Sequence, residues 1–356
     1  MKKSKLPIIA AFAAASAAVG FAYSYAGHSA PWAGVAIGTV CGTVFPALEI
    51  FVFAGASLRR LSFLVYLTVR VATYVVLIGA IMALVVSLFY GPRAVTDIGF
   101  RDFAFTLGVS VVANLIGGMT YLLGPGVLFA FAAGRYHRPR AEERALLFVD
   151  LRGSTAAAER LGETRFLEVL DAFIVDVTSA VEEHGGEIYK YVGDEIIATW
   201  RLRPGRNEAA IVRACFDARD RLRARRPFYQ LSFGMDADFR AALHAGVVVL
   251  GEVGSSKKEI ALIGDAMNTT ARILDACRAN GRRVLASRAL IERLSGLPEA
   301  VAAEPMPPIA ARGKSQPLEV VALERAEAPA APETAAAAPD HWHSQCQRGH
   351  TVVRAL

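Results

Sequence analysis

The chain has 356 residues, of which 54% are hydrophobic and 20% are charged, and its formal net charge is +6. This composition is too hydrophobic for an ordinary soluble protein of this length. Many of the basic residues flank hydrophobic segments, as they do in membrane proteins. The positive charge therefore needs no nucleic acid to explain it, and we expect no nucleic-acid partner.

Four hydrophobic segments lie before residue 135, and each reaches the roughly 20 residues that a helix needs to cross a bilayer. They are Pro7–Gly27, Ala33–Ala54, Phe63–Tyr90 and Phe103–Gly134. The first segment is longer than the hydrophobic part of a signal peptide, and three more segments follow it. We therefore predict that residues 1–134 form a four-helix transmembrane bundle in the lipid bilayer, acting as an anchor and as a possible sensor.

Basic residues flank alternate ends of these segments: Lys2, Lys3, Lys5, Arg59, Arg60, Arg135, Arg138 and Arg140. The first loop on the other side, around residues 28–31, contains neither Lys nor Arg. By the positive-inside rule, both termini and the half of the chain that follows the bundle lie in the cytoplasm.

Two ionisable residues, Glu49 and Arg70, fall inside the predicted spans. Charges at this depth are costly and normally find a partner, so one interpretation is a pair that sets helix packing or senses a signal. The other interpretation is that both lie near the cytoplasmic ends of their helices and extend towards the interface.

The cysteines at positions 41, 215, 277 and 346 show no paired spacing, so we expect reduced, structural thiols. Residues 325–356 are rich in Ala and Pro and are predicted to be a disordered tail.

The segment between the bundle and this tail alternates between strand and helix patterns. The predicted strands are Ala145–Asp150, Glu187–Val192, Glu195–Trp200, Ala241–Val249, Glu259–Ile263 and Leu318–Leu323. The predicted helices are Arg165–His184, Glu208–Arg223 and Asp265–Ala276, and a turn after Ser154 leads into a further one.

Two of these strands end close to an aspartate and a glycine, in the stretches 148–155 and 189–194. Paired strand ends of this kind can bring two carboxylates to one divalent metal, because hard cations such as Mg²⁺ prefer carboxylate and carbonyl oxygens. A third stretch, Gly-Asp-Ala-Met-Asn-Thr-Thr-Ala-Arg at 264–272, places an asparagine and an arginine four residues apart on one helix face.

Together, the three stretches resemble the catalytic domain of the class III adenylate and guanylate cyclases, of the bacterial membrane-anchored type. The resemblance covers residues 144–324 and implies an α+β fold with a ferredoxin-like sheet. It also implies that Asp150 and Asp194, with the carbonyl of Leu151, bind two divalent ions per site, Mg²⁺ or Mn²⁺. Residues 135–143 would then be a short coupling linker.

The same resemblance assigns the groups around the nucleotide. Backbone amides of Gly153, Ser154 and Thr155 would bind the triphosphate at a helix start, although an ordinary helix cap explains Ser154 equally well. Asn268 and Arg272 match the pair that stabilises the transition state. Arg312 stands where the family usually has a lysine that binds the triphosphate, and Lys314 is the second candidate for that role.

Two positions bear on the choice of purine. Lys190 matches the lysine that reads adenine in adenylate cyclases, whereas guanylate cyclases typically carry an acid there. The second position is Ala261, where the family usually has Asp or Thr, and Ala cannot accept a hydrogen bond from the adenine amino group. We expect ATP as the substrate on the basis of Lys190.

In this family the metal aspartates come from one chain, and the base-reading and transition-state residues come from its partner. One chain that carries both sets implies a homodimer with two equivalent composite sites. The resulting prediction is an adenylate cyclase of the bacterial inner membrane that converts ATP to 3′,5′-cyclic AMP and pyrophosphate in cyclic nucleotide signalling.

Three alternatives remain open. The first is a guanylate cyclase. The second is a diguanylate cyclase, because residues 191–195 are similar to the Gly-Gly-Asp/Glu-Glu-Phe hairpin of that family, although Val192 replaces a glycine and Ile196 an aromatic residue. The third is a catalytically decayed membrane receptor, for which only Ala261 argues.

Overall fold

The computed structural model describes residues 6–27, 31–49, 52, 63–123, 138–202, 209–256, 258–309 and 317–325. The chain divides into two compact units, one holding the N-terminal helices and one holding a large sheet. Each unit is described by itself.

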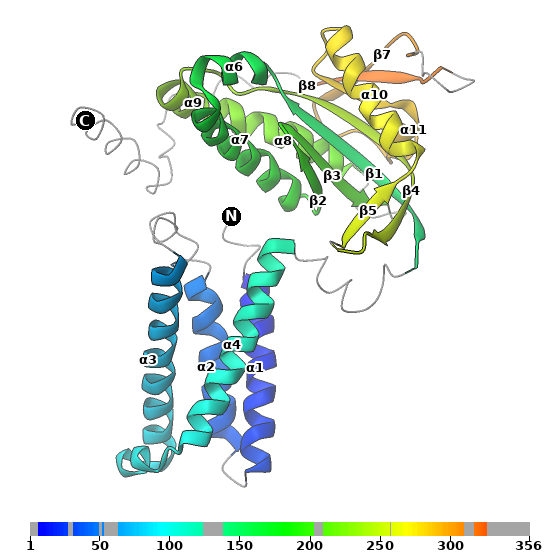
Figure 1. Cartoon of the computed structure of the whole chain (residues 1–356). Helices are drawn as coiled ribbons and strands as arrows, with labels where there is room; N and C mark the ends of the chain where they lie inside the picture. The colour runs from blue at the N-terminus through cyan, green and yellow to red at the C-terminus, as the bar shows by residue number, and fades with distance from the viewer. Residues whose placement is uncertain are drawn as a thin grey trace, which may run out of the picture. The chain divides into compact units, whose positions relative to one another are not determined.

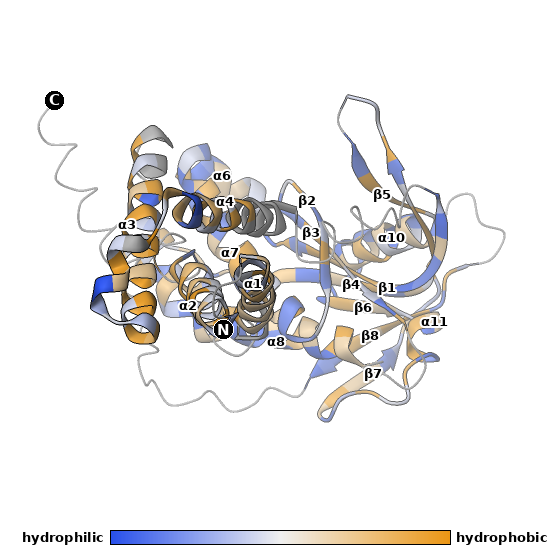
Figure 2. Ribbon diagram, turned by 90° about the horizontal axis from the view of Figure 1, so that it is seen from below, coloured by the Kyte–Doolittle hydropathy of each residue, from blue (hydrophilic) through white to orange (hydrophobic). Residues whose placement is uncertain are grey.

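The N-terminal unit is helical, as predicted (Figure 1). Its main helices are α1 (Leu6–Ala26), α2 (Pro31–Leu48), α3 (Phe63–Tyr90) and α4 (Phe100–Leu123), and a 3-10 turn, η3 (Pro92–Asp97), joins the last two. Hydrophobic residues occur around these helices rather than on one face (Figure 2), which is typical of helices with lipid on their outer surface.

Three of these helices are long and hydrophobic enough to cross a membrane, over Ile9–Ala26, Pro31–Leu48 and Thr68–Tyr90. The fourth predicted span remains a prediction. Its helix, α4, begins three residues before the predicted span and opens with Arg101 and Asp102. Residues 124–134, which would complete that span, lie outside the described residues, as do most of the basic residues on which the predicted orientation depends.

The two ionisable residues of the predicted spans, Glu49 and Arg70, contact each other. Arg70 Nε on α3 lies 2.7 Å from Glu49 Oε1, just after α2, and the Tyr74 hydroxyl also donates a hydrogen bond to Glu49. Phe45 of α2 contacts the Tyr74 ring edge-to-face, with 4.9 Å between the ring centroids. The two residues thus pair with each other, as the first interpretation requires, and both lie near an end of their candidate span, as the second requires. Their role in helix packing remains a prediction.

The second unit is built on one eight-stranded sheet. Its strands are β1 (Arg140–Leu151), β2 (Glu187–Val192), β3 (Glu195–Arg201), β4 (Phe239–Val253), β5 (Glu259–Ile263), β6 (Val284–Ser287), β7 (Val301–Pro305) and β8 (Val320–Arg325). Their order is β2-β3-β1-β4-β6-β8-β7, with β5 paired to the far part of β4. The first four strands form the β-α-β-β-α-β arrangement of a ferredoxin-like fold, as predicted.

Helices cover both faces of this sheet (Figure 1). One core lies between the sheet and the helices α7 (Glu163–Glu183), α8 (Ala210–Ala224) and α9 (Arg226–Phe233). The other core lies between the sheet and α10 (Asp265–Ala279). Alternate residues of β1 enter each core, with Leu147 in the first and Leu146 and Phe148 in the second. Because both faces are buried, the strand appears in the sequence as a continuous hydrophobic run.

The first strand begins at Arg140, five residues before the predicted start. Residues 140–143 of the predicted linker are therefore paired with β4, with Arg140 opposite Leu250. The sequence pattern missed this extension because its residues are polar, and strand pairing with a neighbour overrides composition there.

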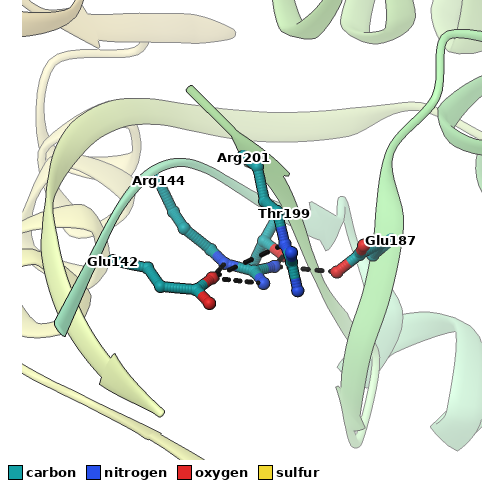
Figure 3. Close-up of polar contacts among 5 residues, drawn as sticks. All are labelled: Glu142, Arg144, Glu187, Thr199 and Arg201. Atoms are coloured by element: carbon teal, nitrogen blue, oxygen red, sulfur yellow. Dashed lines mark hydrogen bonds and ion pairs between the residues drawn. The ribbon is translucent and has the colours of Figure 1, made fainter. Parts of the chain in front are cut away.

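Arg144 lies within this extension and is one of the largest fully buried side chains, with 1% of its surface exposed. Its guanidinium donates hydrogen bonds to Glu142 (2.9 and 3.1 Å), to Glu187 at the start of β2 (2.8 Å) and to the Thr199 hydroxyl on β3 (2.9 Å) (Figure 3). Arg201 Nε lies 3.5 Å from the same Glu142 carboxylate. The cluster connects the start of β1 to β2 and β3.

The three cysteines within the described residues, at positions 41, 215 and 277, are free and buried. Burial raises the pKa of Cys215 and Cys277 to about 12. Both thiols are therefore protonated at neutral pH, as expected for structural cysteines.

Candidate active site

Asp150 lies near the end of β1, on the same face as Leu146 and Phe148. Strand pairing places its Cα opposite Glu195 of β3 and opposite Arg240 of β4. Only 3% of the residue is exposed. A carboxylate this buried requires cationic or hydrogen-bonding partners.

Two arginines supply those partners. Arg278 Nη2 on the last turn of α10 lies 2.6 Å from Asp150 Oδ1, and Arg240 Nη1 lies 3.7 Å from Oδ2. Burial raises the pKa of the Asp150 carboxyl and the charge of Asp194 raises it further, whereas Arg278 and Arg240 oppose this shift. Burial and the Asp150 charge also raise the pKa of Glu195. Asp150, Asp194 and Glu195 thus lie close enough for their charges to repel one another.

Asp194 is brought to this region by the β2–β3 hairpin. The turn consists of Gly193 and Asp194, as predicted, and Asp194 directly precedes the residue opposite Asp150. Gly193 has a φ of 62°, in the left-handed region that favours glycine. Asp194 is partly exposed, whereas Asp150 is buried.

The residues present fit a metal that arrives with a phosphate ligand. Within the described residues, no group of three or more His, Cys, Asp and Glu side chains is arranged to hold a metal ion. Mg²⁺ is usually bound by one or two carboxylates together with substrate phosphates, so Asp150 and Asp194 with the Leu151 carbonyl suffice for that type of site.

The segment after Asp150 turns sharply into helix α6 (Ser154–Leu161). Gly153 caps this helix with a φ of 72°, and its carbonyl accepts the backbone N–H of Ala157 at 2.9 Å. The alternative reading of Ser154 as an ordinary helix cap is wrong, because Ser154 is the first helical residue and the cap makes no side-chain hydrogen bond. The first amides of α6, including those of Ser154 and Thr155, are suited to an anionic ligand.

Helix α10 also carries the asparagine–arginine pair, with Asn268 near its start and Arg272 at its middle. Asn268 is exposed and Arg272 is half-buried, and both lie on α10 as predicted. Arg278, which contacts Asp150, is ten residues after Asn268, so the rise of an α-helix separates the two by about 15 Å along the axis. Asn268 and the Asp150 of the same chain therefore lie at different ends of α10.

Strand β5 leads into this helix through Gly264. A Cβ at Gly264 would lie 3.0 Å from the Val247 carbonyl oxygen on β4, so a larger residue would force the two segments slightly apart. Ala261 is paired with Gly251 of β4, and Lys190 Nζ on β2 lies 2.7 Å from Glu259 Oε1 at the start of β5. The structure therefore places Lys190 beside the start of β5.

Some of the predicted site residues are not placed. Arg312 and Lys314 lie outside the described residues. Sequence reasoning also missed Arg240 and Arg278, the two cations beside Asp150. Arg240 directly precedes a predicted strand and Arg278 follows the predicted end of a helix, so only strand register and helix packing reveal where they point.

The fold and this arrangement of residues agree with the comparison with known families. The model for the adenylate and guanylate cyclase catalytic domain matches residues 137–323. The chain belongs to this family.

Two relatives are named adenylate cyclases. Adenylate cyclase 2 of Rhizobium meliloti (strain 1021) is 39% identical over 202 residues, which are 57% of this chain and 55% of that protein. The adenylate cyclase of Anabaena cylindrica is 29% identical over 154 residues, 42% of this chain and 30% of that protein. The matches therefore span only about half or less of the length of these relatives.

Among solved structures, a bacterial light-regulated adenylyl cyclase aligns with a TM-score of 0.53 at 17% sequence identity, covering 63% of this chain and 65% of that chain. At this identity the likeness supports the fold alone. The family match disfavours the diguanylate cyclase alternative. The chain also retains both aspartates of the predicted metal site and the asparagine–arginine pair, whereas a decayed receptor is expected to have lost one of them.

Proposed function

We propose that the chain is a membrane-anchored adenylate cyclase that converts ATP to 3′,5′-cyclic AMP and pyrophosphate for cyclic nucleotide signalling. The reaction is attack of the ribose 3′-hydroxyl on the α-phosphate of the same nucleotide. Bound Mg²⁺ or Mn²⁺, two ions per site, would neutralise phosphate charge and acidify the attacking hydroxyl.

The residues of the chain take complementary roles in this proposal. Asp150 and Asp194 hold the metal ions, and the first amides of α6 bind triphosphate oxygens. Arg272 stabilises the charge that develops on the α-phosphate, and Asn268 orients the ribose. Arg312 binds the triphosphate, with Lys314 as the second candidate.

The observation that carries the proposal is the separation of these groups along α10. Asp150 contacts the C-terminal end of the helix, whereas Asn268 lies about 15 Å away near its start. The reacting atoms of one nucleotide require both sets within a few ångströms. Two copies in a homodimer, each supplying one set to the other, satisfy this requirement and produce two equivalent sites.

The test is an assay of the full chain in membranes with ATP or GTP, each with Mg²⁺ or Mn²⁺. The expected main product is cyclic AMP, with little cyclic GMP formed from GTP. Cyclic GMP as the main product would assign the chain to the guanylate cyclase alternative. No cyclic nucleotide from a folded dimer under any of these conditions would contradict the proposed function.

A further inference from the structure

Strand β5 contacts β2, although β3, β1 and β4 separate the two strands in the sheet. The Tyr189 hydroxyl accepts a hydrogen bond from the Leu262 backbone N–H at 2.9 Å. One residue further along β2, the Lys190 ammonium donates to Glu259 Oε1 at 2.7 Å. Two adjacent residues of β2 therefore contact the same strand, and Tyr189 also packs against the core beneath α10.

An irregularity in β2 explains how adjacent residues reach one strand. Ile188 pairs with Ala198 and Lys190 pairs with Ile197, so Tyr189 is an extra residue in the register. In a regular strand, Tyr189 and Lys190 would point to opposite faces. A bulge redirects side chains in this way and is frequent beside active sites.

Glu259 and Ala261 lie on the same face of β5, because they are two residues apart in a strand. Ala261 stands at the expected second purine-reading position but has no polar group. Glu259 has a carboxylate, contacts Lys190 and lies on the same face of β5 as Ala261. The acceptor that Ala261 lacks is therefore present two residues earlier.

We propose that Glu259 is a specificity-determining residue that reads the purine together with Lys190. This inference rests on the proposed function and deepens it. The ammonium donates to adenine N1, and the carboxylate accepts from the 6-amino group. Guanine presents the opposite pattern at these positions, an N1–H donor and an O6 acceptor, so it would face a donor with a donor and an acceptor with an acceptor.

The exposure of the pair supports a role in binding rather than in folding. The Lys190 and Glu259 side chains are 46% and 45% exposed. Ion pairs this accessible contribute little to stability, so the pair can be changed without unfolding the domain. The same exposure leaves both groups open to a ligand.

The decisive variant exchanges the two charges: Lys190→Glu with Glu259→Lys in the full chain. The ion pair is kept, but donor and acceptor trade places. The ratio of kcat/KM for ATP to that for GTP should fall by about tenfold to a hundredfold, the range expected for hydrogen bonds to charged groups. Glu259→Gln should lower the ratio less, because its amide can either accept from adenine or donate to guanine.

A rescue variant tests the position of the acid. Glu259→Ala should reduce the ATP preference, and Glu259→Ala with Ala261→Asp should restore it, since the carboxylate moves along one face of β5. The matched control is Lys258→Ala. It removes a neighbouring ion pair with Glu252 in the same hairpin and should leave the ratio unchanged.

Binding measurements separate this inference from the proposed function. Affinities for 3′-deoxy-ATP and 3′-deoxy-GTP, which cannot cyclise, should show the same shifts even if no variant turns over. A wild-type ATP:GTP ratio in folded Glu259→Gln and in the charge exchange, by turnover and by binding, would overturn the role of Glu259. Cyclic AMP formation by the wild-type chain would leave the proposed function standing in that case.

Discussion

Replacing Arg144 by Ala tests whether its buried cluster stabilises the catalytic unit. The guanidinium is charged at any accessible pH and is almost fully buried. Its removal leaves the buried Thr199 hydroxyl and the Glu142 carboxylate, which is only 21% exposed, without this donor. Glu187 is 55% exposed and regains water.

The expected cost follows from these exposures. Removing one partner of a buried ion pair costs about 3–5 kcal/mol. The exposed contact to Glu187 adds only up to about 1 kcal/mol, and Arg201 Nε remains 3.5 Å from Glu142 and compensates in part. We therefore expect the lower end of the range, a loss of about 3 kcal/mol in the free energy of unfolding.

The assay is urea unfolding of residues 138–325 followed by fluorescence of Trp200, the only tryptophan in that range. With a slope of about 2 kcal/mol per molar urea, the midpoint should fall by about 1.5 M. Glu187→Gln should shift it by less than about 0.5 M, because that carboxylate is exposed. As a control, Arg293→Ala removes a surface pair with Glu143 and an exposed hydrogen bond to the Ala289 carbonyl, and it should shift the midpoint as little.

A loss of less than about 1 kcal/mol in Arg144→Ala would refute the reasoning, because it would mean that the cluster is already solvated. An effect of Glu187→Gln as large as that of Arg144→Ala would also contradict it. The Glu187 contact would then be the main one, despite its exposure.

Three further predictions concern catalysis. Asp150→Asn and Asp194→Asn should each reduce cyclic nucleotide formation to background in a folded dimer, and each should weaken Mn²⁺ binding measured by calorimetry with a non-cyclisable nucleotide. Substantial remaining activity in either variant would contradict the metal-site assignment. Chains carrying Asp150→Ala and chains carrying Arg272→Ala, each inactive alone, should recover about one quarter of wild-type activity when mixed, because about half of the dimers are heterodimers and each heterodimer has one intact site of two. Inactive heterodimers would argue against shared sites. A Gly/Ser segment inserted after Pro139, directly before β1, should change activity in membranes markedly if the helical bundle regulates catalysis, whereas unchanged turnover at equal expression would leave the bundle an anchor.

The sequence predicted those features that depend on local pattern. Helical periodicity identified α7, α8 and α10. Alternating or continuous hydrophobic residues identified β2, β3, β5 and the inner part of β1. Each pattern was informative because it reflects which faces of the element are buried. Asp150, Asp194 and Asn268 belong to contiguous motifs, so the resemblance to the cyclase family could single them out as candidate site residues. The short elements β6, β7, α9 and α11 (Arg288–Ile291) were missed, since four to eight residues carry too little periodic signal.

Other features depend on contacts between distant segments, which no local pattern records. The partners of Asp150 are set by the register of β1 against β4 and by the packing of the end of α10, so Arg240 and Arg278 could not be assigned from the sequence. The extra residue in β2 at Tyr189 also depends on pairing with β3, so the sequence alone could not predict it. The sequence by itself thus determined the class of protein and the residue types of its chemistry. Only the tertiary structure decided that Glu259, rather than Ala261, meets Lys190, because that contact joins strands separated by three others in the sheet.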